Sequence, residues 1–156
     1  YGFLRSRLPQ PDLLHLDGAQ GDAAETDIDM LQSVRLLDRF GRERSVMRTC
    51  EPAVIAVDLR QPQRHKGGHL WVGLYRDDGV LCQGCTRPLG NQSGYALRIP
   101  EMALLPGGYT LSAGVWDESA RAFTARPRCV YQFRMVFDRG DHGTVYLRHR
   151  WSWKLP

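Results

Sequence analysis

Four cysteines and five histidines are the side chains of this sequence best suited to metal or covalent chemistry. Cys82 and Cys85 form a Cys-x-x-Cys pair, a spacing found in zinc sites and in thioredoxin-type redox motifs. A zinc ribbon needs a second close pair, whereas Cys50 and Cys129 lie far apart in the sequence. A redox pair opens a helix after a strand, but this pair lies in a β-rich run, and an unbroken strand would point its two thiols to opposite faces. We therefore expect thiols that are buried or at a strand edge, in a reducing compartment.

The sequence contains no recognisable catalytic motif. The histidines have no Ser or Cys near them in a nucleophile elbow, and neither Gly-x-Ser-x-Gly nor His-Glu-x-x-His occurs. The glycine-rich turns do not contain the Gly-x-x-x-x-Gly-Lys-[Ser/Thr] loop of P-loop ATPases. Asp117 and Glu118 are adjacent in a predicted loop, where turn solvation and capping explain them better than a glycosidase pair. These observations favour a binding module over an enzyme, with no cofactor and no metal.

Composition and charge are those of one globular domain. The chain has 156 residues, 42% of them hydrophobic, and a formal net charge of +4. The arginines are scattered, so we expect no nucleic-acid partner. Arginine-rich runs at 39–44 and 148–151 could meet phosphates, although solvated turns and strand ends explain them more simply. No stretch approaches the roughly 20 consecutive apolar residues of a membrane span, and the N-terminus has no secretory pattern.

Two segments differ in character. Residues 1–27 are interrupted by prolines and glycines and end in a small, acidic run, which predicts a linker or tether. From residue 28 the sequence consists of short alternating runs separated by turn residues, with no convincing amphipathic helix. The expected strands are 30–38, 53–59, 69–76, 80–86, 95–99, 109–117, 130–137 and 144–151. About eight short strands predict an all-β domain over 28–156, an immunoglobulin-like antiparallel β-sandwich.

Along three strands that we expect to be neighbours in one sheet, aliphatic residues alternate with aromatic and polar residues. In the predicted topology, strands 69–76, 109–117 and 130–137 are neighbours, so the residues opposite their aliphatic faces share one outward surface. That surface holds Trp71, Tyr75, Ser112, Trp116, Gln132 and Arg134. Flat aromatic rings among hydrogen-bonding groups suit a sugar, and Arg134 could hold a carboxylate or phosphate on an acidic glycan. The sequence thus predicts a carbohydrate-binding site on these residues.

A different interpretation explains the same residues without a ligand. An outward tryptophan on a sheet is often covered by a loop, by a tether or by a dimer partner. In that case Trp71 and Trp116 belong to an interdomain or homodimer interface, and the chain is a structural interaction module. A glycan-modifying enzyme would need an acid and a base side chain paired on this outward surface, and the sequence supplies no such pair there.

Four stretches, taken in order, resemble the C-terminal domain of Wzt-type proteins, the ATP-binding subunits of O-antigen polysaccharide ABC transporters. Leu104 to Asp117 resembles the family pattern L-x-P-G-x-Y-x-L-S-x-G-[aliphatic]-x-D. Val34 to Gly41 is similar to its first strand and turn, and Val72 to Thr86 to its hairpin. Gly143 to Trp151 is similar to its closing strand. The resemblance covers residues 28–153.

The resemblance implies a cytoplasmic sandwich that binds the terminus of a lipid-linked O-antigen polysaccharide and presents it for export. An ATPase domain would precede it in the parent chain, two subunits would act together as a homodimer, and the partner would be a membrane-spanning transporter subunit at the inner face of the bacterial inner membrane. The family's binding surface varies with the glycan, so the resemblance assigns no site residue. Attachment of such a domain to another polysaccharide-processing protein stays open.

Overall fold

The structure is a computed structural model that describes residues 30–60, 67–117, 119 and 121–149, apart from the side chains of 124–130. The linker predicted for residues 1–27 lies outside the described residues, so the division of the chain at residue 28 stays a prediction. The described residues form strands, turns and loops. No helix among them is long and apolar enough to cross a membrane.

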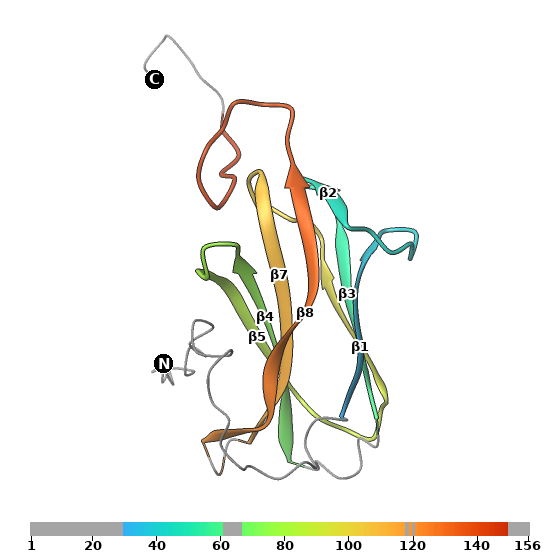
Figure 1. The fold of residues 1–156 in the computed structure, drawn as a ribbon. Coiled ribbons are helices and arrows are strands. Elements are labelled where there is room, and N and C mark those ends of the chain that lie inside the picture. The colour runs from blue at the N-terminus through green and yellow to red at the C-terminus, as the bar shows by residue number, and fades with distance from the viewer. Residues whose placement is uncertain (1–29, 61–66, 118, 120, 150–156) are drawn as a thin grey trace, which may run out of the picture.

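In the described part of the chain, eight strands form two sheets that pack face to face. The strands are β1 (Leu31–Asp38), β2 (Val46–Arg48), β3 (Ala53–Leu59), β4 (Gly68–Arg76), β5 (Leu81–Pro88), β6 (Gly94–Ile99), β7 (Gly107–Asp117) and β8 (Ala122–Val136). A three-stranded sheet has the order β1-β3-β6, and a five-stranded sheet has the order β2-β8-β7-β4-β5. Figure 1 shows β1 and β3 in one layer and β4, β5, β7 and β8 in the other. The predicted all-β sandwich is confirmed.

The strand pairing departs from the expected all-antiparallel arrangement at one place. β2 was not predicted, and it pairs in parallel with β8, with Met47 opposite Met135. A three-residue strand is too short to show alternation, so no sequence pattern predicts it. The other paired strands are antiparallel.

The C-terminal part of the domain also differs from the prediction. β8 begins at Ala122, eight residues before the expected start at Val130, because it continues the pairing with β7 out to Asp117. The expected last strand, 144–151, is not formed between Thr144 and His149. That stretch carries one isolated bridge, between Leu104 and Val145, and residues 150 and 151 lie outside the described residues. A single bridge leaves 138–149 as a loop that folds back over the end of the sandwich (Figure 1).

The core lies between the two sheets, and alternation along the strands selects its residues. β3 contributes Ala53, Ile55, Val57 and Leu59, and β4 contributes Leu70, Val72 and Leu74, all buried. β7 contributes Tyr109, Leu111, Ala113 and Val115, and β8 adds Phe133 and Met135. On β4, β7 and β8 this is the apolar face that the period-two pattern predicts.

Tyr109 fixes the start of β7. Its ring is 1% exposed and stacks on Phe133 with ring centroids 5.7 Å apart. Its hydroxyl donates a hydrogen bond of 2.8 Å to the Leu105 carbonyl, four residues earlier. A tyrosine at this place, bonded to the backbone just upstream, is the tyrosine corner of immunoglobulin-like sandwiches. The Pro-Gly-Gly-Tyr sequence is therefore a structural feature of the fold.

Candidate functional site

The outer face of the five-stranded sheet carries the predicted site, and the register confirms that its residues share one face. β8, β7 and β4 are consecutive neighbours, as predicted. Along this face Tyr75 lies opposite Thr110, which in turn lies opposite Gln132. Gly73 lies opposite Ser112, and His69 opposite Trp116. Parity along the strands therefore placed these residues correctly.

The aromatic rings of this face form one cluster, joined by a residue that was not predicted. Trp71 lies 6.2 Å from Tyr75 between ring centroids. Phe123, at the start of β8, lies 5.6 Å from Trp71 and 5.0 Å from Trp116, with its ring edge-on to both. Phe123 links the two tryptophans, which lie diagonally across the adjacent strands β4 and β7 and are not directly opposite each other.

Glycines make room for the Trp71 indole against the sheet. A Cβ atom added to Gly73 would lie 2.1 Å from the Trp71 ring, so the indole occupies the space of a side chain at position 73. On the neighbouring strand β5, a Cβ added to Gly84 would lie 3.5 Å from the indole Nε1. Gly73 and Gly84 are paired in register. The indole thus lies flat against backbone, the close approach that a glycine inside a strand permits.

Burial on this face does not follow the sequence-based expectation of accessible rings. Trp71 and Tyr75 are 2% exposed, Trp116 is 6% exposed and Ser112 is 0% exposed, whereas Gln132 and Arg134 are exposed. Packing is the physical reason for the burial of the rings, because Trp71, Tyr75, Trp116 and Phe123 contact one another and Trp71 lies against Gly73 and Gly84. Sugar binding by Trp71, Tyr75, Ser112, Trp116, Gln132 and Arg134 stays a prediction.

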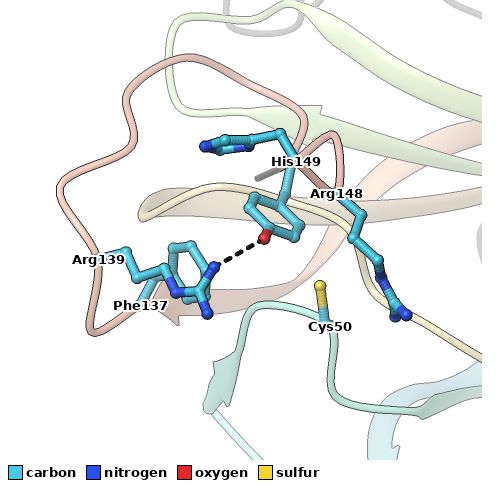
Figure 2. Close-up of a pocket in the computed structure, with 6 residues that line it drawn as sticks. Cys50, Phe137, Arg139, Arg148 and His149 are labelled. Atoms are coloured by element: carbon cyan, nitrogen blue, oxygen red, sulfur yellow. Dashed lines mark hydrogen bonds between the residues drawn. The ribbon is translucent and has the colours of Figure 1, made fainter. Parts of the chain in front are cut away.

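A separate cavity of about 610 Å³ opens at the end of the sandwich where β8 stops. Figure 2 shows side chains from two segments around it. Cys50 comes from the β2–β3 turn, and the loop after β8 supplies the others. We call this cavity the loop pocket, lined by Cys50, Phe137, Arg139, Tyr146, Arg148 and His149.

Hydrogen bonds to the segment between β6 and β7 hold the loop that carries the pocket. The Tyr146 amide donates to the Ala103 carbonyl at 2.8 Å, and the Leu105 amide donates to the Thr144 carbonyl at 3.1 Å. The Cys50 amide donates to the Met102 carbonyl at 2.8 Å. Both walls of the pocket are therefore tied to the same connecting segment, which fixes their separation.

The lining combines aromatic faces with cationic groups. Phe137 and Tyr146 meet edge-on with centroids 5.0 Å apart, and His149 lies 5.9 Å from Tyr146. Arg139 Nη1 donates to the Tyr146 hydroxyl at 3.2 Å, the bond drawn as a dashed line in Figure 2. Arg148 Nη2 donates to Glu101 Oε1 at 3.1 Å. Rings beside fixed donors are the features with which proteins orient polar ligands.

Cys50 is not set up as a nucleophile. Burial raises the pKa of its thiol, and a hydrogen bond to the Glu101 carboxylate raises that pKa further. The same bond, followed by the one from Arg148, lowers the pKa of Glu101. His149 is engaged elsewhere, with Nδ1 2.8 Å from the Leu147 carbonyl oxygen and Nε2 3.5 Å from Asp141 Oδ1. A protonated thiol bonded to a carboxylate lacks the activating base of a cysteine enzyme.

The Cys-x-x-Cys pair lies in strand β5 and is interrupted by a bulge. Leu74 pairs with Gln83 and Tyr75 with Leu81, so Cys82 is the extra residue and packs against the core. Burial raises the pKa of both Cys82 and Cys85. Both are free thiols, and no group of three or more His, Cys, Asp or Glu among the described residues could hold a metal. Cys129 has no described side chain.

Comparison with solved structures finds a related fold in the C-terminal domain of Wzt. The structure is similar to the C-terminal domain of Wzt, with a TM-score of 0.61 and 10% sequence identity over 78% of this chain and 81% of that one. The PmoD soluble domain from Methylocystis sp. (Rockwell) has a TM-score of 0.44 and 11% identity over 69% of this chain and 97% of that one. A CARDB domain from Pyrococcus furiosus, solved with di-metal ions, has a TM-score of 0.35 and 16% identity over 76% and 99%. At 10% identity the likeness to the Wzt domain concerns the fold.

Sequence comparison adds no family assignment: no family model and no curated protein matches this chain.

Sequence reasoning did not identify the loop pocket. Its residues come from positions that look unrelated along the chain, Cys50 and the stretch from Phe137 to His149, and only tertiary hydrogen bonds bring them together. The one available signal was the arginine-rich run 148–151, which the sequence explained as a solvated strand end. The structure leaves the Arg148 side chain exposed to solvent, as that explanation expects, and places it at the rim of the loop pocket.

Proposed function

We propose that this chain is a non-catalytic carbohydrate-binding module that recognises the terminus of a lipid-linked O-antigen polysaccharide for export by an ABC transporter. The observation that carries the proposal is the loop pocket, where the Phe137 and Tyr146 rings adjoin guanidinium and imidazole groups in an open cavity of about 610 Å³. Cavities of roughly 300–1,000 Å³ hold small ligands. The likeness of the fold to the Wzt C-terminal domain supports a polysaccharide as the source of that ligand.

The sheet face predicted from the sequence is the second surface of this proposal. Gln132 and Arg134 are exposed on β8 and within direct reach of a glycan. Contact with Trp71, Tyr75, Ser112 or Trp116 requires a change in the packing that buries them. A long polysaccharide that follows the end of β8 would meet both surfaces.

The proposal places the domain in the cytoplasm, at the inner face of the bacterial inner membrane. Its parent chain would carry the ATPase domain, act as a homodimer and contact the membrane-spanning subunit. The alternative, a structural dimerisation or interdomain module built on the sheet-face aromatics, has less support. Trp71 and Trp116 are already buried within a single chain, so their rings are not presented to a partner.

The test is titration of the chain with the O-polysaccharide of its source strain, using variants of each surface. Tyr146→Ala removes a ring from the loop pocket, and we expect affinity to fall about tenfold, which corresponds to roughly 1.4 kcal/mol. A Gln132→Ala/Arg134→Ala double variant probes the sheet face. Arg98→Ala, exposed on the three-stranded sheet, is the matched control and should bind like the parent chain. Equal binding by all variants, or no binding by the parent chain, would contradict the proposal.

A further inference from the structure

We infer that the loop pocket selects an acidic sugar, one that carries a carboxylate or a phosphate, and that Arg139 is the group that binds the acid. The inference rests on the proposed function and deepens it, because it names the chemical class of the sugar. It starts from the pairing of the cations around the pocket.

Most cations at this end of the domain are already paired with a carboxylate. Arg148 pairs with Glu101 at 3.1 Å, and Arg48 pairs with Asp138 at 2.8 Å. The His149 imidazole lies 3.5 Å from Asp141. Arg139 differs, because within the described ranges its guanidinium has one side-chain partner, the neutral Tyr146 hydroxyl at 3.2 Å, and no carboxylate. A guanidinium has five N–H donors in a fixed fork, so several remain for an incoming anion.

Arg139 is also held in place. The Tyr146 hydroxyl that accepts its bond belongs to a ring packed edge-on to Phe137, and the Tyr146 amide is tied to the Ala103 carbonyl. A guanidinium anchored at one nitrogen loses less freedom when an anion binds than a free one does. Tyr146 is therefore a positioning residue for Arg139, as well as a wall of the pocket.

Two cations flank the Cys50 side of the pocket. Figure 2 shows the Arg139 and Arg148 side chains on either side of Cys50. Both guanidinium groups act on the Cys50 thiol in the direction that lowers its pKa, against the larger effects of burial and Glu101. An anion that approaches the thiol from the open side meets two cations and one carboxylate.

Rings and charge together specify an acidic sugar rather than a simple anion. A sugar presents apolar C–H faces to the Phe137 and Tyr146 rings while its acid group reaches Arg139. A neutral sugar offers the same faces without the acid, and an inorganic anion offers the acid without the faces. The pocket should therefore bind the acidic sugar more tightly than either.

The experiment is calorimetric titration of the 156-residue chain with methyl glucuronide, glucose 1-phosphate, methyl glucoside and inorganic phosphate. We expect the tighter acidic sugar to bind at least about tenfold more tightly than methyl glucoside and than inorganic phosphate. The comparison of the two acidic sugars tells carboxylate from phosphate.

Arg139→Gln should abolish the preference for acid, Arg98→Gln should leave it intact, and added salt should weaken it. Tyr146→Phe keeps the ring and should lose part of the preference.

Three results would overturn the inference: acidic and neutral sugars bound equally, Arg139→Gln unchanged, or inorganic phosphate bound as tightly as the acidic sugars. The first two, found together with retained polysaccharide binding, would remove the acid selectivity and leave the proposed function standing. Loss of polysaccharide binding as well would remove both. Circular dichroism of Arg139→Gln and Tyr146→Phe checks that each variant is folded, and either one alone is sufficient for the test.

Discussion

Trp71 illustrates how a single side chain on a sheet face becomes structural. Its indole lies in the space that a side chain at Gly73 would fill, and Phe123 packs edge-on against it. A tryptophan that contacts backbone on one side and aromatic rings on the other stabilises the fold through its buried apolar surface. A residue that looks like a ligand platform in the sequence is therefore part of the packing in the fold.

Gly73→Ala tests this directly. The added methyl group would meet the indole at 2.1 Å, so the ring or the strand must shift. We expect the free energy of unfolding to fall by about 1–3 kcal/mol, the usual cost of overpacking. Urea denaturation measures it. Gly140→Ala is the control, because a Cβ there meets nothing within 4 Å. Equal stability of the two variants would show that the indole does not depend on position 73.

Tyr109→Phe tests the corner at the start of β7. The change keeps the ring on Phe133 but leaves the buried Leu105 carbonyl without the hydroxyl that bonds it at 2.8 Å. We expect a loss of about 1–3 kcal/mol in the free energy of unfolding. Tyr95→Phe, which removes a hydroxyl bonded to the Gly90 amide from a half-buried residue, should cost less. A Tyr109→Phe protein as stable as the parent chain would be inconsistent with the corner.

At the scale of elements, the turn after β1 gives stability that depends on pH. The Asp38 carboxylate accepts hydrogen bonds from the amides of Arg42 and Phe40, and Arg44 lies 3.9 Å away. The Arg42 amide is the largest cause that lowers the Asp38 pKa below its ordinary value of 3.8, and Phe40 and Arg44 act in the same direction. Because the folded pKa is lowered, this stabilisation is present above about pH 4 and is lost as pH falls through the folded pKa.

Asp38→Asn should therefore be less stable than the parent chain at pH 7, and the difference should shrink as pH falls below about 4. The amide oxygen of Asn still accepts from the turn, so the variant isolates the charge. Urea unfolding at pH 7 and at low pH measures the difference. A gap of the same size at both values would mean that the Asp38 charge does not contribute.

Period-two alternation predicted most of the elements. β4 and β7 alternate over nine or more residues, and their core faces are predictable for that reason. β3 is apolar at nearly every position, so its sequence predicts a buried strand but not the face that meets the core. β2 was not, because three residues show no period. The sequence predicts a strand only from residue 130, so the first half of β8, which includes Phe123, lies outside the predicted strands. The stretch at 144–149 alternates like a strand but forms a single bridge, because pairing depends on a partner edge that local sequence does not reveal.

For the candidate site on the sheet face, alternation along the strands predicts which residues share a face but not how exposed they are. Strand order and alternation put Trp71, Ser112 and Gln132 on one face, and the register agrees. Their exposure was not predictable, because it depends on Phe123 and on the room left by Gly73 and Gly84. The loop pocket was out of reach for a similar reason, since tertiary hydrogen bonds assemble it from distant segments.

At the scale of the whole molecule, the closely packed regions lie apart from the open cavity. The core and the aromatic part of one outer face are closely packed, whereas the end beyond β8 keeps an open cavity with aromatic and cationic walls. Loops at the end of a rigid sandwich are where such domains usually bind ligands. The proposed recognition of a glycan terminus, rather than of the middle of a chain, is consistent with a pocket of about 610 Å³ at one end of the domain.

The most direct measurement is calorimetric titration of this chain with the O-polysaccharide of its source strain, intact and after removal of the terminal residue. A module that recognises the terminus through the loop pocket should bind the intact polymer at one site per chain and lose most of that affinity when the terminal residue is removed. Equal affinity for the two polymers, or no binding of the intact one, would contradict the account.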